Sequence, residues 1–298
     1  MAAILVTGAN GQLGNELRNL SNQFYGYDFA FTDIDTLDIT NTVAVKNFIE
    51  TFNPNWIINC AAYNYVDKAE SEPETAMLIN STAVKNLTEA INGLDCKLIH
   101  ISTDYVYGGT SNTPCTEDAV PDPQCIYAAS KLAGEKQALS FPDTIVIRTS
   151  WLYSTYGHNF VKSILKNGAE KEFLEVVFDQ TGTPTYAADL AQAIMKIVSG
   201  VIRNQFVFKA GIYNYSNEGV CSWFDFATEI VKEAGLKCRI LPVTSQKFIQ
   251  AAKRPSYSVM DKTRIKDDFD IEIPHWRTSL IECLKALNYA EQGKNFII

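Results

Sequence analysis

Residues 3–14 read AILVTGANGQLG, an apolar run that turns directly into a glycine-rich segment. The apolar residues 3–7 are typical of a buried strand, and residues 12–20 have the spacing of an amphipathic helix. A glycine-rich turn between a first strand and a first helix is the arrangement that binds a dinucleotide pyrophosphate in an open α/β sheet. We therefore predict a dinucleotide site here rather than a plain glycine turn, because the segment opens a longer strand–helix alternation.

Three glycines and Asn10 belong to the predicted pyrophosphate loop. Gly8 permits the tight turn, Gly11 lets the backbone approach the pyrophosphate, and Gly14 lets the helix pack closely on the sheet. The helix N-terminus then presents unpaired N–H groups and the positive end of its dipole to the phosphates.

Acidic residues follow the second predicted strand. Asp33 lies 25 residues after Gly8, where a carboxylate can accept a hydrogen bond from the adenosine ribose 2′-hydroxyl. No Arg or Lys occurs between residues 19 and 45, so a 2′-phosphate has no obvious cation there. This favours NAD(H), whereas Asp35 is better explained as a solvated loop charge.

The first half of the chain alternates short apolar runs with longer amphipathic ones. The alternation predicts a Rossmann-type doubly wound parallel sheet that binds its ligand at the carboxyl ends of the strands. The predicted strands are residues 3–7, 29–32, 56–60, 97–102 and 144–148, and the predicted helices are residues 12–20, 42–52, 73–92 and 126–140.

The second half has a looser pattern. We expect residues 1–150 to form an NAD(P)-binding domain and residues 151–298 to form mainly a smaller substrate-binding cap, with segments that return to the first domain. The elements predicted there are helices at residues 159–167, 187–199, 222–234 and 278–287 and a strand at residues 213–215.

A YxxxK pattern lies on the predicted helix 126–140. Tyr127 and Lys131 share one helix face at this spacing, and an ammonium beside a phenol is expected to lower its pKa from the reference value near 10. Thr103 ends the fourth predicted strand, where its hydroxyl can bond the same substrate oxygen. Glycine loop, Thr103 and YxxxK in this order indicate acid–base chemistry beside a nicotinamide.

These motifs resemble the extended short-chain dehydrogenase/reductase family and, within it, the dTDP-4-dehydrorhamnose reductases. The resemblance spans nearly the whole chain and implies reduction of the C4 ketone of dTDP-4-dehydro-L-rhamnose to dTDP-L-rhamnose, a step of nucleotide-sugar and cell-surface polysaccharide biosynthesis. Tyr105 stands where related dehydratases carry glutamate, which favours simple reduction over water elimination. The segments that carry the resemblance are residues 11–14, 59–63, 66–70, 102–107, 127–135, 148–153, 179–185 and 254–255.

The resemblance also implies residue roles. The catalytic triad is Thr103, Tyr127 and Lys131, and Lys131 also holds the nicotinamide ribose. The cofactor contacts are Gly11, Gln12, Leu13, Asp38, Ile39, Ala61, Ala62, Tyr63 and Asn64. The substrate contacts are Thr103, Asp104, Tyr127 and Trp151 at the sugar and Asn159 and Arg254 at the diphosphate. The family uses both NADPH and NADH, which leaves the preference open.

Composition restricts the other classes of function. The net charge of −8 argues against binding of nucleic acid or of an anionic membrane. No apolar run reaches the roughly 18 residues of a bilayer span, and residues 1–6 lack the basic region of a secretion signal. Seven scattered cysteines without a CxxC indicate free thiols in a reducing compartment, and three unpaired histidines argue against a metal site. We expect a metal-free cytoplasmic enzyme, monomeric or homodimeric, whose partner is a small-molecule nucleotide sugar.

Two alternatives stay open. The first is another nucleotide-sugar reductase or epimerase on the same scaffold. The second is a non-catalytic regulatory subunit, against which the intact Thr103, Tyr127 and Lys131 argue.

Overall fold

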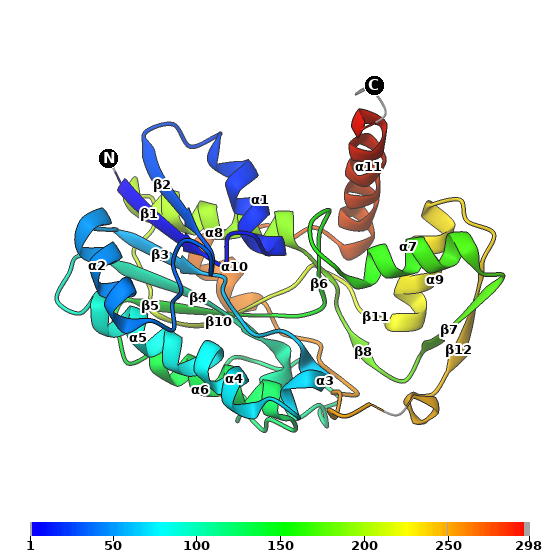
Figure 1. Cartoon of the computed structure of the whole chain (residues 1–298). Coiled ribbons are helices and arrows are strands. Elements are labelled where there is room, and N and C mark those ends of the chain that lie inside the picture. Colours follow the sequence, from blue (N-terminus) through cyan, green and yellow to red (C-terminus); the bar gives the residue numbers. More distant parts are fainter. Residues whose placement is uncertain (1, 249, 295–298) are drawn as a thin grey trace.

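Six strands form one parallel sheet, in the order β10-β5-β4-β3-β1-β2 (Figure 1). The structure is a computed structural model that describes residues 2–248 and 250–294, with side chains described as far as residue 288. The strands are β1 (Ala2–Thr7), β2 (Tyr27–Thr32), β3 (Trp56–Asn59), β4 (Lys97–Thr103), β5 (Thr144–Thr149) and β10 (Gly211–Tyr215). The predicted Rossmann-type doubly wound parallel sheet is confirmed.

Helices cover both faces of this sheet, and for this reason its central strands are apolar along their length. In β1, Ile4 and Val6 pack in one core cluster, and Leu5 packs in another on the opposite face. The covering helices are α1 (Gln12–Ser21), α8 (Ala187–Ile202) and α10 (Thr263–Phe269) on the first face and α2 (Thr42–Phe52), α5 (Ala83–Ala90) and α6 (Ile126–Ala138) on the second (Figure 1). Successive side chains of β1 therefore point to opposite faces of the sheet and contribute to two core layers.

The predicted helix 73–92 is interrupted. It divides into α4 (Pro73–Met77), a π-helical turn (Leu78–Thr82) and α5, and a separate short α3 (Val66–Ala69) precedes it. The π turn packs against α6, where a Cβ atom on Gly134 would lie 2.0 Å from the Asn80 carbonyl oxygen. Apolar periodicity alone does not reveal such a turn, because it inserts one residue without changing the composition.

A third core cluster lies beside the sheet and contains Val161, Ile164, Phe226, Trp276 and Leu280. Its helices pack near three two-stranded pairs, β7–β12, β8–β11 and β6–β9. The elements are β6 (Leu152–Tyr153), α7 (Phe160–Glu170), β7 (Phe173–Val177), β8 (Thr181–Gly182), β9 (Thr185–Tyr186), β11 (Cys221–Ser222), α9 (Trp223–Glu233), β12 (Arg239–Val243) and α11 (Trp276–Lys294). No helix of the described residues has the combination of length and hydropathy that crossing a membrane requires.

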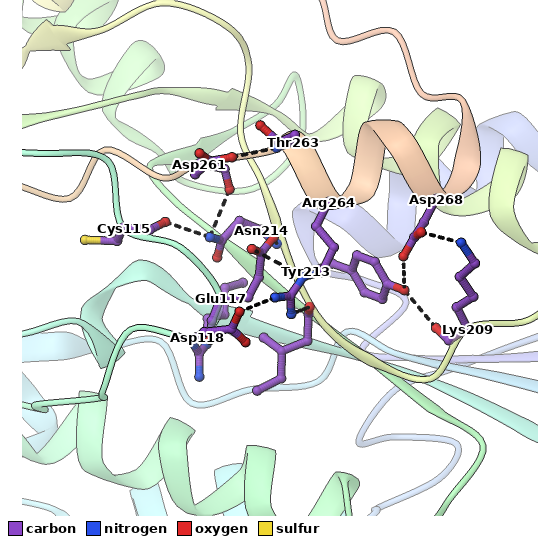
Figure 2. Close-up of polar contacts among 12 residues, drawn as sticks. Cys115, Glu117, Asp118, Lys209, Tyr213, Asn214, Asp261, Thr263, Arg264 and Asp268 are labelled. Carbon is purple, nitrogen blue, oxygen red and sulfur yellow. Dashed lines mark hydrogen bonds and ion pairs between the residues drawn. The ribbon is translucent and has the colours of Figure 1, made fainter.

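Strand β10 comes from the second half of the chain but pairs with β5 at the edge of the main sheet. Figure 2 shows polar contacts that hold it there. The Asn214 amide donates to the carbonyl oxygens of Cys115 at 2.9 Å and Asp261 at 3.0 Å. The Asn214 backbone N–H donates to the Glu117 carboxylate at 3.0 Å. These contacts join two distant loops to one strand.

Candidate functional site

A cavity of about 620 Å³ opens at the carboxyl ends of the main-sheet strands. The pattern of strands and helices predicts a ligand at this edge. The cavity is lined by Gly8, Gly11, Gln12, Leu13, Gly14, Cys60, Ala62, Asn64, Tyr65, Val66, Ile101, Ser102, Thr103, Asp104, Tyr105, Tyr127, Lys131, Thr149, Ser150, Trp151, Leu152, Gly157, His158 and Trp223. The glycine loop and the predicted catalytic residues therefore face one space.

The glycine loop has the conformation that its sequence predicts at two positions. Gly8 has φ +65°, and a Cβ atom there would lie 2.5 Å from the Ala61 nitrogen. A Cβ atom on Gly14 would lie 2.5 Å from both Ala9 Cα and the Gly8 carbonyl oxygen. Gly11 precedes α1, whose N-terminus has no side-chain cap and no acidic residue in its first turn. The uncapped N-terminus of α1 thus lies at the cavity wall, which fits a pyrophosphate.

The acidic residues after β2 are engaged in local contacts. Asp33 accepts hydrogen bonds from the N–H groups of Asn10 and Ile34, both at 2.8 Å, which ties it to the glycine loop. Asp38 accepts from the backbone N–H and the hydroxyl of Thr40 at 2.9 and 2.7 Å. The Ile39 side chain is buried in the core. Asp33, Asp38 and Ile39 are not among the residues that line the cavity.

The segment after β3 enters the cavity through Ala62 and Asn64. Ala61 instead packs against Gly8, and the buried Tyr63 donates its hydroxyl to Glu72 at 2.7 Å.

Asn80 of the π turn fixes this segment. Its amide accepts from the Tyr63 N–H at 2.8 Å and donates to the Tyr63 carbonyl at 3.1 Å and to the Ser130 hydroxyl at 2.9 Å. The sequence reasoning missed Asn80, and the only available signal was a polar residue on an otherwise apolar helix face.

The three predicted catalytic side chains converge from β4 and α6. The Tyr127 hydroxyl lies 3.5 Å from Asn64 Oδ1, and Tyr127 is 8% exposed. Lys131 donates from Nζ to the Ile101 carbonyl oxygen at 2.6 Å. Thr103 ends β4 and donates its hydroxyl to Asp104 at 3.1 Å. The arrangement sets a proton donor, a cation and a hydroxyl around one space beside the glycine loop.

Burial sets the protonation of this group. It raises the pKa of the Tyr127 phenol above its ordinary value and lowers the pKa of Lys131 to about 8. The prediction that Lys131 lowers the pKa of Tyr127 is therefore wrong in this structure. Loss of solvent around the phenol is the largest cause of its raised pKa, and the Lys131 ammonium donates to the Ile101 carbonyl. Tyr127 stays protonated at neutral pH, the state that a proton donor needs.

Asp104 is a buried acid in the cavity wall. Its side chain is 2% exposed, and its Oδ2 atom has no hydrogen-bond partner among the described residues. Burial raises its pKa to about 6, although nearby hydroxyl groups offset part of this effect. A buried carboxylate oxygen without a hydrogen bond raises the free energy of the folded state, and a polar ligand that donates a hydrogen bond to it would remove this cost.

Trp151 also lines the cavity and has a backbone that non-glycine residues rarely adopt. Trp151 follows the end of β5 and has a φ of +48°. Its ring stacks on the ring of Trp223, with centroids 3.6 Å apart and planes 10° apart. Strained backbone of this kind gathers at functional sites. Trp223 begins α9 and was missed from the sequence, where it is one apolar residue of a predicted helix.

A second cavity of about 380 Å³ adjoins the first and shares Tyr105 and Trp223 with it. Arg254 lines this second cavity. Asn159, predicted beside Arg254, is placed elsewhere: it lines neither cavity. It caps α7, and its amide donates to Gln12 Oε1 at 3.0 Å. Its predicted contact with the diphosphate stays a prediction.

Within residues 2–248 and 250–294, no three His, Cys, Asp or Glu side chains are arranged to hold a metal ion. All seven cysteines are free thiols.

The family described as the RmlD substrate binding domain matches residues 1–289. The chain belongs to this family. It is 38% identical over 288 residues to a dTDP-4-dehydrorhamnose reductase of Aggregatibacter actinomycetemcomitans, covering 94% of this chain and 97% of the relative. It is 39% identical over 291 residues to the spore coat polysaccharide biosynthesis protein SpsK of Bacillus subtilis, covering 97% and 99%.

Solved structures agree with this membership. The dTDP-4-dehydrorhamnose reductase of Bacillus anthracis, in complex with NADP, superposes with a TM-score of 0.90 at 39% identity. The match covers 96% of this chain and all of that chain. This relative thus shares nearly the whole of the architecture, both the sheet and the segments that flank it.

Proposed function

We propose that this protein reduces the C4 ketone of dTDP-4-dehydro-L-rhamnose to dTDP-L-rhamnose with NADPH or NADH, within nucleotide-sugar biosynthesis for cell-surface polysaccharides. The observation that carries the proposal is the single cavity in which the glycine loop meets Thr103, Tyr127 and Lys131. The names of the full-length relatives support the substrate.

The cofactor's place follows from the residues that fit it. Gly8, Gly11 and Gly14 leave room for the pyrophosphate at the uncapped N-terminus of α1. Asp33, held at the edge of the glycine loop, stands at the adenosine end. Bound NAD(P)H supplies the hydride, and Lys131 orients the nicotinamide ribose.

The proton comes from Tyr127. Its raised pKa keeps the phenol protonated until negative charge develops on the sugar O4, and Thr103 donates a hydrogen bond to the same oxygen. Lys131 carries a positive charge at neutral pH, because its pKa of about 8 lies above 7. Catalysis is thus positioning combined with acid catalysis and electrostatic stabilisation.

The substrate spans the two adjoining cavities. Asp104 accepts a hydrogen bond from a sugar hydroxyl, and the Trp151 ring packs against the pyranose. The diphosphate then lies toward Arg254 in the second cavity, because a guanidinium binds phosphate oxygens in a bidentate manner. Asn159 supports the site indirectly, because its amide donates a hydrogen bond to Gln12, which lines the first cavity.

We also propose the division of the chain into two domains that its sequence predicts. Residues 1–150 form the NAD(P)-binding domain and residues 151–298 mainly the substrate-binding cap, with α8 and β10 as the segments that return to the sheet. The seven free thiols support a reducing, cytoplasmic setting. The protein acts as a monomer or a homodimer, and sedimentation analysis distinguishes the two.

The test is turnover of enzymatically generated dTDP-4-dehydro-L-rhamnose, followed by loss of NADPH or NADH absorbance, with the product identified by chromatography and mass. Formation of dTDP-L-rhamnose supports the proposal. Cofactor binding without turnover would instead direct the search to other nucleotide sugars and then to a regulatory role.

A further inference from the structure

Asp67 contacts a side chain and a backbone N–H of one segment that is distant in the sequence. Its Oδ2 atom pairs with Arg254 Nη2 at 2.5 Å, and its Oδ1 atom accepts the backbone N–H of Ala252 at 3.1 Å. Asp67 lies on α3, directly after Asn64, Tyr65 and Val66, which line the first cavity. One carboxylate therefore connects the wall of the first cavity to the cation of the second.

Asp67 fixes the Arg254 side chain but does not occupy all of its N–H donors. Its side chain is 16% exposed and lines the second cavity. A guanidinium carries five N–H donors. Among the described residues, only the Asp67 carboxylate and the Ala252 carbonyl, the latter at 3.5 Å, accept from it. The remaining donors are available to an anionic ligand in that cavity.

We propose that Asp67 is a positioning residue that presents Arg254 to the substrate diphosphate, an inference that rests on the function proposed above. An arginine side chain loses much rotamer freedom when it is fixed. Asp67 imposes that loss before the ligand arrives, so the ligand binds a guanidinium that is already in place.

Asp67 also carries a negative charge that repels a diphosphate, and the two effects oppose each other. Its side chain is 47% exposed, so solvent and salt weaken the repulsion. The ordering of Arg254 and of the backbone at Ala252 is not screened in this way. Preorganisation therefore outweighs repulsion, and loss of the carboxylate weakens binding.

The chain contains a matched control. Arg264 pairs with Asp118 at the same distance, 2.5 Å, and likewise joins segments far apart in the sequence (Figure 2). Neither residue lines either cavity. Asp118→Asn removes an ion pair of the same length, although a more exposed one, without touching the proposed substrate path.

The experiment measures the Kd of dTDP by calorimetry and steady-state kinetics for the unmodified protein, Asp67→Asn, Arg254→Met, the double variant and Asp118→Asn. For Asp67→Asn we expect the dTDP Kd and the substrate KM to rise about two- to fivefold, within the range measured for exposed ion pairs. The kcat and the NADPH Kd should not change. In the Arg254→Met background, Asp67→Asn should add nothing, because the group that it positions is gone.

Three results would overturn the inference: an unchanged or lower dTDP Kd in Asp67→Asn, an equal loss in Asp118→Asn, or a further loss in the Arg254→Met background. A parallel rise in the NADPH Kd would likewise contradict it, since it would indicate a general structural defect. Failure of the proposed function is distinguishable, because it appears as absence of turnover of dTDP-4-dehydro-L-rhamnose by the unmodified protein, whereas the inference is tested by the dTDP Kd of the variants.

Discussion

Three buried side chains, Tyr127, Lys131 and Asp104, determine the charge of the cavity wall. Burial keeps the phenol and, at mildly acid pH, the carboxyl in their neutral forms, and it weakens the hold of Lys131 on its proton. Such opposed shifts are typical of acid–base sites. The proton for the sugar oxygen is assigned to Tyr127, because it faces the cavity beside Thr103 and stays protonated at neutral pH.

Tyr127→Phe should therefore lower kcat by about 10²–10⁴-fold. The phenyl ring keeps the packing against Tyr105, whose ring centroid lies 5.5 Å away, so the NADPH Kd should be nearly unaffected. Single-turnover kinetics and a fluorescence titration with NADPH measure the two quantities. Turnover at the unmodified rate would exclude Tyr127 as the proton donor.

Asp104 predicts a pH dependence of stability. Its folded pKa, about 6, lies above the unfolded value of 3.8, so the folded state binds the proton more tightly between these values. This contribution to the free energy of unfolding is complete below pH 3.8 and is lost as the pH rises through 6. Relative to Asp104→Asn, the unmodified protein should lose on the order of 3 kcal/mol across this window.

Urea unfolding of both proteins at several pH values measures that difference. Asp118→Asn, which removes an exposed carboxylate, controls for the loss of one negative charge. A pH-independent difference between the unmodified protein and Asp104→Asn would show that the buried carboxyl does not titrate in this range.

At the scale of elements, the glycine loop depends on the contact between α1 and its own turn. Gly14→Ala would place a Cβ atom 2.5 Å from backbone atoms of Gly8 and Ala9, which cannot move aside as a flexible side chain can. We expect a loss of about 1–3 kcal/mol in the free energy of unfolding and a weaker NADPH affinity.

Gly168→Ala on α7 is the matched control. Its Cβ atom would meet the flexible end of Leu236 at 3.2 Å, so helix propensity should offset most of the crowding. Thermal unfolding and NADPH titration of both variants test the contrast. Equal effects of the two substitutions would contradict the close packing assigned to Gly14.

The strands and helices of the first half could be predicted because their apolar patterns are long and the strands are buried on both faces of the sheet. The strands β7 and β12 could not. They pair with each other across more than 60 residues, Arg239 opposite Phe173, and Pro242 interrupts the strand pattern of β12. The predicted helix 159–167 begins one residue later because Asn159 is its N-cap.

At the scale of the whole molecule, the site is assembled from both halves of the chain. The first half provides the glycine loop, Thr103 and the Tyr127 helix, whereas Trp151, Trp223 and Arg254 come from the second. The first set could be predicted from motifs because its spacing is local. Trp223 and the Asp67–Arg254 pair depend on contacts between distant segments, which no local spacing encodes.

The central claim is hydride transfer to the sugar C4, with the proton supplied by Tyr127. The most direct measurement is turnover of dTDP-4-dehydro-L-rhamnose with NADPH that carries deuterium at the transferred position, followed by NMR of the product. We predict one deuterium, bound to C4 of dTDP-L-rhamnose, and none in the same time with Tyr127→Phe. Product without deuterium, or deuterium at another carbon, would contradict this account.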